Sequence, residues 1–99
     1  MSTMVLKFAI GEGSGPGLHQ VVMPEHAEII HVYEEAGTVT ARARVPVQPS
    51  KFKPVLFALA TTATPVDDQF PHYIGTVHMR HTGLVLDVFA CPHLGVANA

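Results

Sequence analysis

Prolines divide this chain into pieces that are too short for long helices. Eight of the 99 residues are proline and eight are glycine. A proline inside a helix lacks the N–H donor and its ring clashes with the preceding turn, so it ends or kinks the helix. The pieces between the prolines are rich in Val, Ile, Thr and Phe and have the length of β-strands. The prolines are Pro16, Pro24, Pro46, Pro49, Pro54, Pro65, Pro71 and Pro92.

Apolar and polar residues alternate in several of these pieces, as they do in a strand with one buried face. The clearest strand is 38–45, which places Arg42 and Arg44 on the face opposite its apolar side chains. Glu34 to Gly37 precedes it and reads as a hairpin turn, with Gly37 at the positive φ. The segments 73–80 and 84–91 form a second predicted hairpin across 81–83. Almost wholly apolar residues fill 55–63, which predicts a central strand, with a buried helix as the rival interpretation.

The sequence therefore predicts one all-β domain over residues 1–99. Six or seven antiparallel strands form a sandwich or a barrel-like roll. Residues 11–17 form a flexible glycine-rich loop, 46–54 a surface loop and 94–99 a C-terminal tail. The predicted core consists of Ile30, Val32, Val39, Ala41, Phe57, Leu59, Val77, Leu86 and Val88.

Few charges cover this small domain. Charged residues make up 14% of the chain, against about 25% in typical soluble proteins. We therefore expect either a neutral polar surface or an apolar surface buried against a second copy of the chain. The net charge of −2 provides no general attraction for nucleic acid or acidic lipid. One cysteine, Cys91, and a short apolar start that lacks a cleavage site indicate the cytoplasm.

Catalytic and metal-binding motifs are absent from the sequence. Seven histidines are scattered without the spacing of a zinc site, so we expect neither a metal nor another cofactor. No Ser/His/Asp or Cys/His signature occurs, and the glycine-rich loop lacks the lysine of a phosphate-binding loop. Asp87 is exceptional because it lies between apolar residues of the last strand. It either pairs with a cation such as Arg80 or lines a pocket with His72 nearby.

Arg42 and Arg44 are the strongest candidates for a binding site. Two guanidinium groups about 7 Å apart on one face of a strand suit a phosphate or a carboxylate. The alternative is a solvated outer face with ordinary salt bridges. The candidate ligand-binding residues are thus Arg42, Arg44, Asp87 and His72.

Several short blocks resemble a family of short proteins of unknown function encoded by tailed phages and prophages. The blocks are Met23-Pro24 with Ala27, Ile30 and Val32, then Tyr73-Ile74-Gly75-Thr76, and finally Val88-Phe89. The resemblance implies a small phage-encoded accessory protein in the host cytoplasm. This sequence departs from the family pattern at Thr61 to Thr64, where members have a Gly-Thr-Gly-His-like turn, and at Leu86-Asp87, where they have a Trp-His pair.

These observations favour a non-enzymatic phage accessory protein that forms homo-oligomers. It would bind a host factor or sequester a small, phosphorylated ligand through Arg42 and Arg44. The alternative is a structural protein of the virion, either a head-decoration or a tail-associated subunit.

Overall fold

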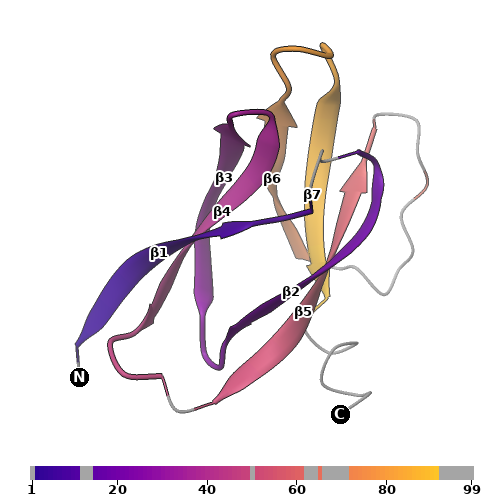
Figure 1. Cartoon of the computed structure of the whole chain (residues 1–99). Helices are drawn as coiled ribbons and strands as arrows, with labels where there is room; N and C mark the ends of the chain where they lie inside the picture. The colour runs from indigo at the N-terminus through magenta and orange to yellow at the C-terminus, as the bar shows by residue number, and fades with distance from the viewer. Residues whose placement is uncertain (1, 12–14, 50, 62–64, 66–71, 92–99) are drawn as a thin grey trace.

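The computed structural model describes residues 2–11, 15–49, 51–61, 65 and 72–91, and every regular element among them is a β-strand. Figure 1 shows these strands as two layers that cross each other. The strands are β1 (Thr3–Ala9), β2 (Gly17–Pro24), β3 (Glu28–Glu35), β4 (Thr38–Pro46), β5 (Phe52–Ala60), β6 (His72–His78) and β7 (Val85–Cys91). The predicted tail, 94–99, lies outside the described residues.

The two layers are antiparallel sheets. One has three strands in the order β1-β4-β3, and the other has four in the order β2-β5-β7-β6. β4 is therefore the interior strand of the first sheet, and β5 and β7 are the interior strands of the second. The all-β prediction is confirmed, and the helical alternative for 55–63 is excluded over the part that belongs to β5.

The turn between β3 and β4 is the predicted hairpin. Glu35 pairs with Thr38, so Ala36 and Gly37 alone form the loop. Ala36 has φ 51° and Gly37 has φ 85°, and positive φ at both central residues is the signature of a type I′ turn. Glycine adopts such a φ without cost, whereas the Cβ of alanine is crowded by the following carbonyl oxygen.

We expect Ala36→Gly to stabilise the protein and Gly37→Ala to destabilise it. Relief of the left-handed strain at position 36 contributes about 0.5–1 kcal/mol after the extra chain entropy of glycine is subtracted, and strain at position 37 costs about 1–2 kcal/mol. No atom lies within 4 Å of a Cβ added at Gly37, so strain alone is measured there. Urea unfolding of both variants tests this, and equal effects of the same sign would contradict the turn assignment.

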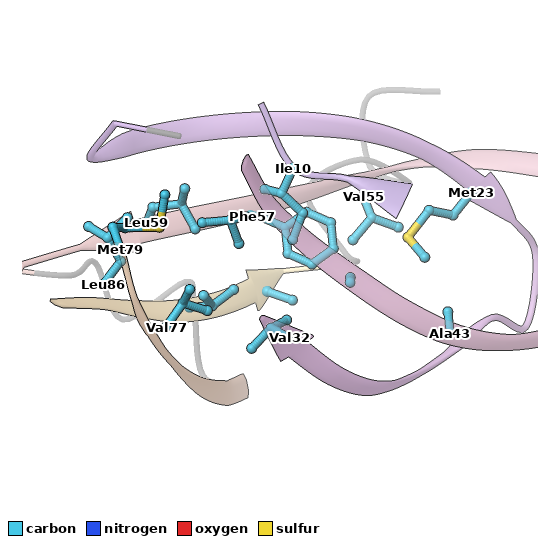
Figure 2. Packing of buried hydrophobic residues seen from close by; sticks show 14 of the residues in the cluster. Ile10, Met23, Val32, Ala43, Val55, Phe57, Leu59, Val77, Met79 and Leu86 are labelled. Atoms are coloured by element: carbon cyan, nitrogen blue, oxygen red, sulfur yellow. The ribbon is translucent and has the colours of Figure 1, made fainter. Parts of the chain in front are cut away.

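Inward-facing side chains of both sheets form one core. Phe57 lies in its middle beside Ile10 and Val55, as Figure 2 shows. All predicted core residues are buried except Ile30, which is 46% exposed. That prediction is wrong because a β-bulge between Ile29 and His31 interrupts the alternation of β3.

The predicted loop 46–54 is shorter than expected, because β5 already begins at Phe52. Pro54 lies within β5 and pairs with Val22 of β2. Proline is excluded from central strands because it has no N–H to donate. Among the described residues the pairing of β5 with β7 begins only at Leu56, so no described strand needs an N–H from Pro54 on that side.

The segment Tyr73-Ile74-Gly75-Thr76 shapes the contact between the two sheets. β6 contacts β3 of the other sheet, and a second bulge lies between Tyr73 and Gly75. A Cβ added at Gly75 would lie 3.0 Å from Cγ2 of Val32. Glycine at this position therefore allows β3 and β6 to approach closely.

Candidate anion-binding face

Arg42 and Arg44 lie on the outer face of the three-stranded sheet, as the alternation predicted. Their neighbours Ala41, Ala43 and Val45 point inward and have no exposed surface. Both arginines are exposed. Because β4 is the middle strand, strands on both sides extend the surface around them.

The strand register places two further basic side chains beside Arg42. His31 of β3 and Lys7 of β1 both lie directly opposite it. Opposite residues on one face have Cβ atoms about 5 Å apart, so the three form a row across the sheet. We call Lys7, His31, Arg42 and Arg44 the cationic face. Glu28 and Val5 lie opposite Arg44.

The arginines of this face are available for a ligand. No ion pair joins Arg42 or Arg44 to another residue in the part of the chain that the structure describes. Lys7, by contrast, donates from Nζ to Oε1 of Glu35 at 3.0 Å. That hydrogen bond, together with the charge of Glu35, raises the pKa of Lys7 above its ordinary 10.5. Lys7 is therefore cationic at neutral pH, and the carboxylate of Glu35 balances its charge.

An aromatic pair borders the cationic face. The rings of His31 and Tyr33 are stacked, with centroids 5.7 Å apart and planes 11° from parallel. Tyr33 lies opposite Thr40 of β4, one step along the same face from Arg42. The register places this pair beside Arg42, where it offers a flat surface next to the charges.

Asp87 and His72 lie on the other sheet, away from the arginines. Asp87 lies opposite Thr76, whose Oγ1 donates a hydrogen bond to Oδ1 of Asp87 at 2.8 Å. The hydroxyl groups of Tyr73 and Thr76 are also hydrogen-bonded to each other. His72 is exposed and lies opposite Ala90, which belongs to the core. Asp87 thus has a polar partner, and the register does not place His72 beside it.

Arg80 is not the partner of Asp87. Its backbone N–H donates to Oε1 of Glu34 at 3.1 Å, and its Nε lies 3.9 Å from the same atom. The Glu34 side chain is only 10% exposed, so these contacts compensate a carboxylate that is mostly removed from water. The expected pairing fails because the turn after β6 brings Arg80 to the β3–β4 hairpin.

A small depression lies where these turns meet. Its volume is about 80 Å³, which is well below the roughly 300 Å³ of the smallest typical ligand pockets. It is lined by Gly15, Glu34, Gly37, Met79, His81, Thr82 and Leu84. This depression is therefore a poorer candidate site than the cationic face.

Sequence reasoning missed Lys7, His31 and Tyr33. In its own strand each of them lies on the face opposite the apolar side chains, as Arg42 does in β4. That alternation was the available signal. Among the described residues, no group of three or more His, Cys, Asp or Glu side chains is arranged to hold a metal ion. In the same part of the chain, no helix has the length and apolar character needed to cross a membrane.

Comparison with known proteins places the chain in a family but supplies no activity. No curated protein and no solved structure matches it. A family model described as a domain of unknown function, DUF7352, matches residues 1–97. The chain therefore belongs to the DUF7352 family.

Proposed function

We propose that this protein is a non-enzymatic binding protein whose cationic face holds an anionic group, foremost the phosphate of a small ligand. The observation that carries the proposal is the pair of exposed arginines without an ion pair among the described residues. A planar guanidinium presents two parallel N–H donors, which match a phosphate or a carboxylate. The His31–Tyr33 stack beside the arginines offers a surface for a ring.

The biological setting of the proposal comes from the sequence. The blocks around Met23-Pro24, Tyr73 to Thr76 and Val88-Phe89 resemble short proteins of tailed phages and prophages. In that setting the protein is an accessory factor in the host cytoplasm that sequesters a phosphorylated metabolite or binds a host factor. Absence of a catalytic constellation from the sequence favours binding over turnover.

Replacing both Arg42 and Arg44 with Ala tests this proposal. Hydrogen bonds to charged groups contribute about 1.5–3 kcal/mol, so the double variant should bind a phosphorylated probe about ten- to a hundredfold more weakly. Titrations with pyrophosphate and with nucleoside triphosphates, followed by calorimetry or NMR, measure this. The fold should persist, because both side chains point away from the core.

A charge-matched control separates the site from general electrostatics. Lys51→Ala with Lys53→Ala removes the same two charges from the start of β5 and the residue before it. This control should bind the probes as well as the unaltered protein does. Equal losses in both double variants, or no binding of any probe by the unaltered protein, would contradict a site at the arginines.

The second candidate function is that of a virion structural subunit. It is favoured by apolar side chains on the outer face of the four-stranded sheet, where Leu18 is 63% exposed and Val22 is 59% exposed. Such surface suits permanent contacts in a particle. Mass spectrometry of purified virions distinguishes the two functions, because a structural subunit is present in stoichiometric amount and an accessory protein is not.

A further inference from the structure

β1 is an open edge of the three-stranded sheet. Among the described residues only β4 pairs with it. Three consecutive apolar residues, Met4, Val5 and Leu6, are 37%, 42% and 38% exposed. Natural edge strands are normally protected by proline, bulges or charge. β1 carries one charged residue, Lys7, and that side chain is engaged by Glu35.

The backbone of β1 offers a regular set of hydrogen-bonding groups at this edge. The carbonyl of Ser2 accepts from the N–H of Val47 at 3.3 Å, and the N–H of Ile10 donates to Val39 at 2.8 Å. In an antiparallel strand alternate residues direct both groups to the same side. Even-numbered residues of β1 therefore face β4. The odd-numbered residues Thr3, Val5, Lys7 and Ala9 direct their N–H and C=O groups to the open side.

We propose that a second copy of this chain occupies this edge, with its β1 antiparallel to the first. The pairing is centred on Leu6, so that Thr3 lies opposite Ala9 of the second copy and Val5 opposite Lys7. All four outward-directed residues then pair with outward-directed residues, as the antiparallel ladder requires. The assembly is a twofold dimer with one continuous six-stranded sheet.

Side chains select this register among those that the backbone permits. The centre at Leu6 places Met4 opposite Phe8, so apolar side chains meet on the inner face of the sheet. A centre at Lys7 would place the two lysines opposite each other, which is unfavourable. A centre at Val5 would leave Ala9 unpaired. Only the centre at Leu6 uses β1 over its full length, Thr3–Ala9.

The dimer would also enlarge the cationic face. A twofold axis perpendicular to the sheet leaves both outer faces on the same side. Arg42 and Lys7 of the two copies then line one surface that crosses the dimer interface. The pairing itself rests on β1 alone and does not depend on the proposed ligand.

The first test uses proline at position 5. In Val5→Pro the lost N–H points away from β4, so the monomer fold should persist while the pairing is broken. Val5→Thr keeps the N–H and serves as the matched control. Light scattering at high micromolar concentration should give twice the 10.6 kDa of one chain for the unaltered protein and for Val5→Thr. It should give the monomer mass for Val5→Pro, with an unchanged circular dichroism spectrum.

A second test addresses the register without touching the backbone. Thr3→Glu with Ala9→Glu places like charges opposite each other twice in the dimer, whereas Thr3→Lys with Ala9→Glu places opposite charges there. We expect the first pair to raise the dimer dissociation constant about tenfold relative to the second. A monomeric unaltered protein, a dimeric folded Val5→Pro variant or equal dissociation constants for the two charge pairs would each overturn the proposal.

Discussion

Phe57→Ala should destabilise this protein by about 3–5 kcal/mol, the usual cost of deleting a buried aromatic ring. Phe57 has no exposed surface and is the largest side chain among those that are fully buried. It projects from an interior strand into the space between the two sheets, where Figure 2 places it beside Ile10 and Val55. Both sheets lose packing contacts at once, and β-sheet backbones do not collapse into the void without losing their register.

This loss is large relative to the whole stability of the domain. A chain of 99 residues is stable by about 5–15 kcal/mol. For a domain of this size each kcal/mol corresponds to about 4–8 °C in the unfolding midpoint. The midpoint should therefore fall by about 12–40 °C, which thermal unfolding followed by circular dichroism measures directly.

Phe52→Ala is the matched control for this prediction. Phe52 belongs to the same strand and is 60% exposed, so its removal should cost less than about 1 kcal/mol. Equal losses at positions 52 and 57 would contradict the placement of the core between the sheets. A loss of stability in Phe52→Ala alone would indicate that β5 presents its opposite face to the core.

The strands were predictable from the sequence because their signals are local. Prolines exclude long helices, and alternation within 38–45 gives both the strand and its buried face. The errors occur where the alternation is interrupted or where pairing is only partial. A bulge cannot be read from a regular pattern, so Ile30 was assigned to the wrong face of β3. Pro54 was assigned to a loop because a strand accepts proline only where its N–H is not needed for pairing, and that depends on where β7 begins to pair with β5.

The candidate site was only partly predictable for the same reason. Arg42 and Arg44 share a face through the geometry of one strand, and this is confirmed by their burial pattern. Their neighbours Lys7 and His31 come from strands before them in the sequence, and pairing between strands depends on the whole fold. One interpretation of Asp87 was a cross-strand pair with a cation such as Arg80, yet the partner of Arg80 is Glu34, far away in the sequence.

Gly11→Ala should destabilise the protein by about 2–4 kcal/mol, through strained backbone and through a steric clash. Gly11 has φ +72°, and a Cβ added there would lie 2.1 Å from Nδ1 and 2.9 Å from Cγ of His19. The second distance matters most, because Cγ is close to the main chain and a rotation about χ2 does not move it. The His19 ring is also held from its other side by a hydrogen bond between Nε2 and the carbonyl oxygen of Gly15, at 3.0 Å.

The two causes are separable by a double-mutant cycle. Removal of the ring in His19→Ala eliminates the clash but leaves the positive φ. In the His19→Ala background, Gly11→Ala should therefore cost only the backbone strain of about 1–2 kcal/mol. The difference between the costs of Gly11→Ala in the two backgrounds is the coupling energy between Gly11 and His19. Residues in direct contact typically show coupling energies of about 0.5–3 kcal/mol, which is on the order of the steric part expected here.

Gly15→Ala provides the control within the same connection. No atom lies within 4 Å of a Cβ at Gly15, and its φ is not in the positive range, so its replacement should change the stability by less than about 0.5 kcal/mol. Urea unfolding of the single and double variants gives the free energies of unfolding that the cycle requires. A Gly11→Ala variant as stable as Gly15→Ala would show that His19 does not pack against Gly11.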